Sequence, residues 1–271
     1  MSPYLWTVLV NQISISFVVY SHLVPTIVAI ALGIFLFLKT KKLSTLYLLL
    51  LCASFSIFAF FDLAVWIFNG EEIMFFWSIL DIFSVSFFIL SYWFLYSFVK
   101  ERDLPLWQKV LTAGALVPTL VTTVMSINMN TYLVAIGVAI ENQTITNYLS
   151  FLEIFFILLV IIFTIVQYRK APDANNKKKI VLAGVGVTAF LFTFLFAYAI
   201  VNFIIAINLW GLASTSYVYN ISPYALFGMP IFLAFLGYLI AKYQAFDVKL
   251  IKSIVYMVLL MVLLFVGLFF T

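Results

Sequence analysis

Apolar runs of about 20 residues recur along the whole chain, and they constrain the fold more than any other feature. A run of that length crosses roughly 30 Å of hydrocarbon as an α-helix. Within lipid only helices and closed barrels satisfy their own backbone hydrogen bonds, and barrel strands alternate polar and apolar residues. These runs are apolar on all sides, and only 9% of the 271 residues are charged. The sequence therefore predicts an all-α, polytopic transmembrane helix bundle.

Charged or turn-rich breaks separate seven predicted helices. These cover residues 14–38, 45–68, 75–98, 109–127, 148–168, 180–206 and 220–243. We expect residues 1–252 to form one seven-helix transmembrane domain. A further run, residues 253–271, is still apolar at Thr271 and predicts the truncated start of an eighth transmembrane helix.

The basic residues predict the orientation of the bundle. All 14 Lys and Arg fall on one side of the predicted helices, and the positive-inside rule makes that side cytoplasmic. The opposite loops contain Glu71, Glu72 and Glu141 but no Lys or Arg. We therefore expect a multi-pass protein of the plasma or inner membrane with its N-terminus outside. The net charge of +4 then reflects topology, and no nucleic-acid partner is expected.

Two of the predicted outer connections are longer than turns. Residues 128–147 are rich in β-branched side chains, which favours a short hairpin or cap over the bundle. Residues 207–223, which precede the seventh predicted helix, are expected to contribute to the same lid.

Three carboxylates interrupt the apolar runs. Asp62, in the stretch AFFDLAVWI, Asp81 and Glu153 each lie five or six residues from an outer helix end, or about 8 to 9 Å deep at the helical rise. His22 and Asn202 fall at comparable depth. A carboxylate that faces lipid costs a few kcal/mol, so these side chains are expected to face the bundle interior or a wet cavity.

The third predicted helix supports an interior polar surface. Ser78, Asp81 and Ser84 are spaced by three residues, and Ser91 follows seven residues later. We predict a pocket that opens outward, in which Asp62 and Asp81 bind a cationic or hydrogen-bond-donating group and tryptophans at the rim cover an apolar part. The candidate ligand-binding residues are Asp62, Asp81, Trp66, Trp77, Glu153, His22 and Asn202. The alternative is that these Asp and Ser side chains only cross-link helices, through hydrogen bonds worth about 1 kcal/mol.

Catalytic and metal-binding patterns are absent from the sequence. There is one His and one Cys, no His, Cys and carboxylate cluster with metal-ligand spacing, no GxSxG and no P-loop. No enzymatic activity, metal or cofactor is therefore expected on this chain. Retinal binding is not expected either, because the only lysine of the seventh predicted helix, Lys242, lies at its cytoplasmic end. That helix also contains Pro223, Gly228, Pro230 and Gly237, which favour a hinge.

The exit from the seventh predicted helix carries a family resemblance. Residues 237–256, GYLIAKYQAFDVKLIKSIVY, resemble the end of the N-terminal seven-transmembrane region of bacterial sensor histidine kinases. The match rests on Lys242, Tyr243, Phe246, Asp247 and Lys249. The stretch YRKAPDANNKKKIVLAGVGVT, between the fifth and sixth predicted helices, is similar to the family's basic loop and glycine-containing helix.

The resemblance implies a membrane sensory domain for two-component signalling. Such a domain would detect an extracytoplasmic or membrane-borne signal, such as a small ligand on the outer side, and relay it to a cytoplasmic histidine kinase in cis or in trans. It also implies a homodimer. In this scheme the signal passes through Pro230, Gly237, Phe246 and Asp247. The phospho-acceptor His motif and the ATP-binding domain are missing from this chain, so no kinase residue is carried over.

Three other functions compete with this prediction. A small transporter or channel would use the acids as part of a proton or cation path, but it predicts polar groups across the full membrane depth and an inverted repeat. We find no such repeat. A membrane-embedded enzyme would need convergent nucleophiles or metal ligands. A subunit of a larger membrane complex is compatible with the same sequence.

Overall fold

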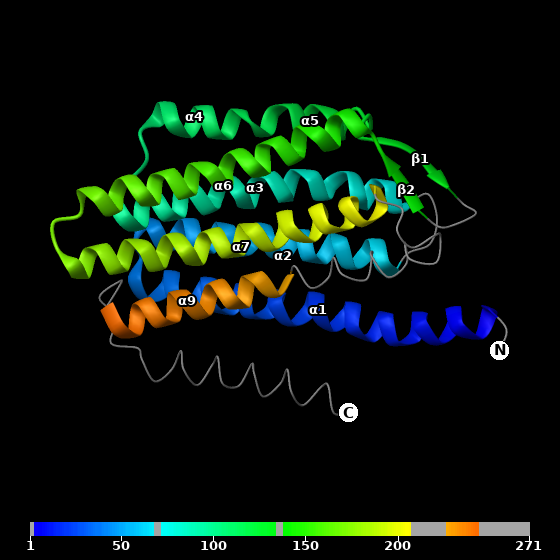
Figure 1. Cartoon of the computed structure of the whole chain (residues 1–271), viewed down its shortest axis with the longest axis horizontal. Coiled ribbons are helices and arrows are strands. Elements are labelled where there is room, and N and C mark those ends of the chain that lie inside the picture. The colour runs from blue at the N-terminus through cyan, green and yellow to red at the C-terminus, as the bar shows by residue number, and fades with distance from the viewer. Residues whose placement is uncertain (1–2, 68–71, 134–137, 207–225, 244–271) are drawn as a thin grey trace.

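The computed structural model describes residues 3–67, 72–133, 138–206 and 226–243, and these residues are mostly helical. The long helices lie side by side along the long axis of the molecule (Figure 1). They are α1 (Pro3–Thr40), α2 (Leu43–Ile67), α3 (Glu72–Lys100), α6 (Gln143–Lys170), α7 (Ala174–Ala206) and α9 (Gly228–Tyr243). Two short helices, α4 (Leu106–Gly114) and α5 (Leu116–Val124), follow α3.

Five stretches of these helices are long and apolar enough to cross a membrane. They are Val18–Thr40, Leu43–Ile67, Met74–Lys100, Gln143–Lys170 and Ala174–Leu195. Together they identify a multi-pass membrane protein and confirm the predicted helical, transmembrane class.

The long helices close into a ring. α1 packs on α2, α2 on α3, α3 on α6, α6 on α7, α7 on α9, and α9 returns to α1. Helix α3 also contacts α5 and α7, so it has the most neighbours in the bundle. An event that moves α3 therefore reaches most of the other helices directly.

Aromatic side chains fill the middle of the ring. Four of them, Phe55 of α2, Phe87 of α3, Phe190 of α7 and Phe232 of α9, are fully buried. Phe190 lies edge-on to Phe55 at 6.2 Å between ring centroids and stacks on Phe232 at 5.5 Å. Rings in such geometries attract one another beyond the area that they bury. The apolar centre separates the polar groups at the two ends of the bundle.

The predicted hairpin is confirmed. Strand β1 (Met129–Leu133) pairs antiparallel with β2 (Val138–Glu141), with Leu133 opposite Val138 and Met129 opposite Glu141. Met129 is buried against Val65, Met74 and Trp77, at the adjoining ends of α2 and α3. The hairpin lies at the end of the bundle where α1 begins (Figure 1), which we call the hairpin end.

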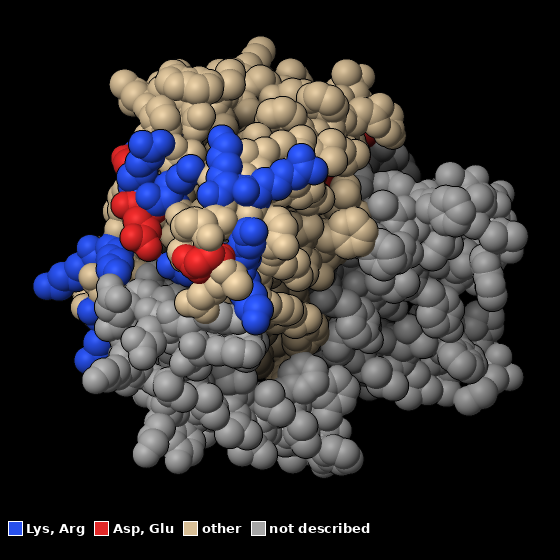
Figure 2. Space-filling model, turned by 60° about the vertical axis from the view of Figure 1, so that its left-hand side comes forward, with Lys and Arg blue, Asp and Glu red and all other residues tan. Residues whose placement is uncertain are grey.

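Lys and Arg residues of the described chain gather at the opposite end, which we call the basic end. The α1–α2 turn, the α3–α4 connection and the start of α7 meet there, since Lys42, Arg102 and Lys179 line one cleft. Lys and Arg side chains gather on this face, with a few carboxylates among them (Figure 2). This gathering agrees with the predicted placement of the basic loops on one side of the membrane.

The prediction of one continuous helix over residues 109–127 is wrong. The structure has two short helices there, α4 and α5, with Ala115 between them. Pro118 has no N–H to donate to the carbonyl of Gly114, four residues earlier, so the ladder of hydrogen bonds is interrupted there. The Tyr148 hydroxyl of α6 donates to the Ala115 carbonyl at 2.9 Å and satisfies an acceptor at the break.

Candidate functional site

The predicted polar stripe of α3 faces the interior, as expected, because Ser78 and Ser91 are buried. Its partner at the hairpin end is Asn128, which is 2% exposed and directly precedes β1. The Asn128 side-chain nitrogen donates to Asp81 Oδ2 at 2.8 Å and to the Ser78 carbonyl at 3.2 Å. The Asn128 side-chain oxygen accepts from Ser78 Oγ at 2.8 Å. These three bonds fix the amide and join the hairpin to α3.

Glu141, at the end of β2, makes a second link between the hairpin and the helices. The indole N–H of Trp77 donates to Glu141 Oε1 at 2.7 Å, and the Thr146 hydroxyl of α6 donates to Oε2 at 2.8 Å. A single carboxylate thus bridges α3, the hairpin and α6. We call the residues Trp77, Ser78, Asp81, Asn128, Glu141 and Thr146 the hairpin network.

Glu153 lies next to the hairpin network on α6. It accepts from Ser84 Oγ at 3.2 Å, which continues the polar stripe of α3 one turn deeper. Asp81, Glu141 and Glu153 interact electrostatically with one another. Within the described residues, however, no group of three or more His, Cys, Asp or Glu side chains is positioned to hold a metal ion. The arrangement is one of hydrogen-bonded carboxyls that share a half-buried space.

His22 and Asp62 form a separate pair between α1 and α2. His22 Nε2 lies 2.9 Å from Asp62 Oδ2, and the two side chains are 1% and 20% exposed. His22 Nδ1 lies 2.6 Å from the Val18 carbonyl oxygen, which can only accept, so Nδ1 carries a proton. The Asp62 side chain therefore has a buried imidazole as its hydrogen-bond partner, which explains how an acidic residue is accommodated in an apolar run.

The structure divides the predicted site residues into two groups. His22 and Asp62 make one group, and Trp77, Asp81 and Glu153 belong to or adjoin the hairpin network. Next to Asp62 in the chain, Phe61 of α2 stacks on Phe83 of α3 with 6.0 Å between ring centroids. Trp66 is half-buried near the end of α2, and no hydrogen bond or ring contact of Trp66 falls within the described part of the chain.

The remaining predicted residues lie toward the C-terminal part. Asn202 lies on α7, at a position where the side chain is outside the described structure. Pro230 lies in the first turn of α9, where its missing N–H removes no intrahelical hydrogen bond. Gly237 lies inside α9. Phe246 and Asp247, the predicted lid at 207–223 and the eighth run at 253–271 lie outside the described residues.

A network at the basic end was not predicted from the sequence. Asp103 follows α3 and accepts from the Tyr47 hydroxyl of α2 at 2.7 Å, from the Leu104 backbone N–H at 2.8 Å, and from the Lys109 ammonium of α4. The Lys109 ammonium lies 5.9 Å from the ring centroid of Trp93 on α3. We call Tyr47, Trp93, Asp103 and Lys109 the Asp103 network. Tyr47 and Asp103 are 56 positions apart, so no local pattern marks the contact.

Ion pairing sets the protonation of the Asp103 network. Burial acts to raise the pKa of Asp103, but hydrogen bonds from Lys109, Tyr47 and the Leu104 backbone outweigh it and lower the pKa below its ordinary value. The hydrogen bond to Asp103 raises the pKa of Lys109. Both groups are therefore charged at neutral pH. Each end of α3 is thus tied by polar contacts to neighbouring segments.

Comparison with protein-family models, curated proteins and solved structures finds none that matches this chain.

Proposed function

We propose that this chain is a membrane sensory domain that detects a signal at the hairpin end and relays it through α3 to the basic end. The observation that supports this proposal most directly is the pair of polar networks at the two ends of one helix. The hairpin network holds α3 against the hairpin and α6, and the Asp103 network holds the far end of α3 against α2 and α4. A ligand that prefers one arrangement of the hairpin network would bias the packing of α3.

The positions of the charges suggest how the domain is oriented. With the basic end in the cytoplasm, the hairpin end faces outward and the relay runs inward. The resemblance of residues 237–256 to sensor histidine kinases supports a cytoplasmic kinase, in cis or in trans, as the receiver, and a homodimer as the working form. The signal would be a small cationic or hydrogen-bond-donating ligand, or a property of the membrane itself.

A chimera tests the relay. The chain is joined at Lys252 to the cytoplasmic dimerisation and ATP-binding domains of a histidine kinase, and autophosphorylation is measured while the outer medium is varied in pH and cation content. We expect a change of about fivefold or more, the lower end of ordinary allosteric coupling. Asp81→Asn should abolish the response without loss of expression. Gln143→Ala, an exposed substitution at the same end, should leave the response intact.

The transporter alternative gives a different result. Proteoliposomes that contain the native chain would then take up protons or cations down an imposed gradient, and Asp62→Asn would abolish the uptake. Flux in this assay together with a chimera that responds to none of the conditions would refute the sensory proposal.

A further inference from the structure

We propose that a cleft at the basic end binds the phosphate of an anionic phospholipid headgroup from the adjoining leaflet. This inference concerns the end of the bundle opposite the hairpin network and does not depend on the sensory role. The cleft has a volume of about 340 Å³. Its walls come from the end of α3, the end of α6 and the first turns of α7.

The depth of the cleft matches the level of lipid headgroups. Lys100 and Lys170, which line it, are the last residues of two of the membrane-spanning stretches. Phe98 and Ile180 form a buried apolar floor on the side of the bundle core. A cleft at the ends of spans opens where hydrocarbon gives way to the charged interface, and basic pockets between helices at this level suit phosphate headgroups.

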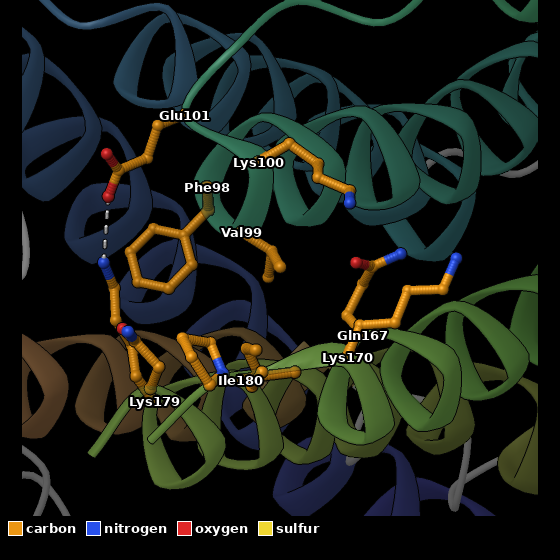
Figure 3. A pocket seen from close by; sticks show the side chains of 11 residues that line it. Phe98, Val99, Lys100, Glu101, Gln167, Lys170, Lys179 and Ile180 are labelled. Carbon is orange, nitrogen blue, oxygen red and sulfur yellow. Dashed lines mark hydrogen bonds and ion pairs between the residues drawn. The ribbon is translucent and has the colours of Figure 1, made fainter. Parts of the chain in front are cut away.

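The charge of the lining is complementary to a phosphate. Three lysines, Lys100, Lys170 and Lys179, face one carboxylate, Glu101, which gives a net charge of +2. Within the described residues, Lys100 and Lys170 have no hydrogen-bonded or ion-paired partner. Figure 3 shows Lys100 from α3 on the same side of the cleft as Gln167 and Lys170 from α6. Two ammonium groups and a neutral amide donor therefore converge from two helices.

Lys179 is held only weakly by protein groups. Its ammonium lies 3.4 Å from Glu101 Oε1 and 5.0 Å from the ring centroid of Phe98 (Figure 3). The Glu101 side chain is 77% exposed, so water screens the ion pair and it contributes little. A phosphate can replace Glu101 as the partner of the Lys179 ammonium, because charge-assisted hydrogen bonds to phosphate are about twice as strong as neutral ones. An adjoining cleft of about 300 Å³ adds Lys42 and Arg102 to the cationic surface.

The outer surface of α6 distinguishes a lipid from a soluble anion. Ile162, Ile165 and Val166 are exposed on the turns that lead up to Gln167. They provide an apolar track along which an acyl chain can lie while its phosphate occupies the cleft. A soluble phosphate ester would make no use of this track.

Native mass spectrometry of the full chain in detergent provides the test. The protein is titrated with phosphatidylglycerol and, separately, with phosphatidylcholine of the same acyl chains. We expect phosphatidylglycerol to bind more tightly. Lys100→Gln/Lys170→Gln should weaken its binding about tenfold or more, because each substitution removes a hydrogen bond to a charged group. Lys100→Arg/Lys170→Arg should retain tight binding.

The matched control is Lys177→Gln/Lys178→Gln, which removes the same charge from the same end without touching the lining. It should bind phosphatidylglycerol within about twofold of the native chain, as expected of surface positions outside the cleft. An equal loss in the control would overturn the proposal in favour of diffuse charge attraction. Displacement of the lipid by glycerol 3-phosphate at similar concentration would instead identify a site for soluble phosphate esters.

A second measurement needs no substitution. Photoactivatable phosphatidylglycerol, with its reactive group beside the phosphate, is cross-linked to the native chain in vesicles of phosphatidylcholine. Cross-links at the end of α3 and in the α6–α7 turn are expected. Cross-links found only elsewhere would refute the site even if the glutamine variant does not fold.

Discussion

At the scale of single residues, Asn128 is the side chain on which the hairpin network depends. It is buried and makes three hydrogen bonds with Ser78 and Asp81. We expect Asn128→Ala to lower the free energy of unfolding by about 1–3 kcal/mol, because it leaves buried polar groups without partners.

Asn130 supplies the control for this prediction. It is exposed and donates one hydrogen bond, at 3.2 Å, to the Glu141 carbonyl. Asn130→Ala should change the free energy of unfolding by less than about 0.5 kcal/mol. Unfolding in detergent, followed by circular dichroism, measures both variants. Equal stabilities for the two would show that the Asn128 bonds contribute nothing.

Asp103 gives a pH-dependent prediction at the same scale. Its pKa in the folded protein lies below the unfolded value of about 3.9. Its contribution to stability is therefore full above about pH 5 and is lost as the pH falls through the folded-state pKa. Because the Asp103 side chain is 47% exposed, we expect Asp103→Asn to cost no more than about 1 kcal/mol at pH 7. The difference from the native chain should shrink as the pH falls below about 4, and a difference that does not change with pH contradicts this account.

At the scale of elements, the contact between α6 and α7 depends on a glycine. A Cβ added at Gly184 would come within 2.9 Å of the Thr164 Cβ and closer still to the rest of that side chain. Gly184→Ala should therefore destabilise the bundle by about 1–3 kcal/mol, as overpacking does. Thr164→Ala in the same chain should recover part of the loss.

Gly114 is the matched control, because a Cβ there meets nothing within 4 Å. Gly114→Ala should be neutral or stabilise α4 by up to about 1 kcal/mol, since alanine is the better helix former. Thermal unfolding of the three variants in one detergent compares them directly. A loss at Gly114 as large as that at Gly184 would rule out close packing as the cause.

The elements were largely predictable, for physical reasons that also explain the exceptions. In lipid a continuous apolar run satisfies its backbone hydrogen bonds only as a helix. The sequence therefore predicted the long helices, and most of their ends, to within a few residues. The break at Ala115 could not be predicted, because one proline within an apolar run is also compatible with an intact membrane helix. The hairpin was predictable because β-branched residues gather between two spans. Which helices are neighbours was not predictable, because packing depends on side-chain shape rather than on periodicity.

At the scale of the whole molecule, the depth of the polar residues was predictable but their partners were not. The cost of burying a carboxylate predicts that Asp62 and Asp81 face the bundle interior or a wet cavity, and both are hydrogen-bonded to other segments of the chain. Which groups satisfy them depends on residues far away in the chain. Asp62 is paired with His22, forty positions earlier, and Asp81 with Asn128, forty-seven later. The prediction of one shared outer pocket rested on the depth of these residues alone. In the structure their contacts form two separate groups.

The orientation of the whole bundle yields the last prediction. The hairpin end and the basic end lie at opposite ends of the helices (Figure 1), so they should face opposite sides of the membrane. The native Cys52 is fully buried and is replaced by alanine to leave a chain without thiols. Asn130→Cys then marks the hairpin end and Asn175→Cys the basic end, both at exposed positions and without change of charge. A membrane-impermeant maleimide on intact cells should label the first and reach the second only after permeabilisation, because basic loops stay in the cytoplasm. Labelling of Asn175→Cys in intact cells would reverse the orientation, and with it the direction of the proposed relay.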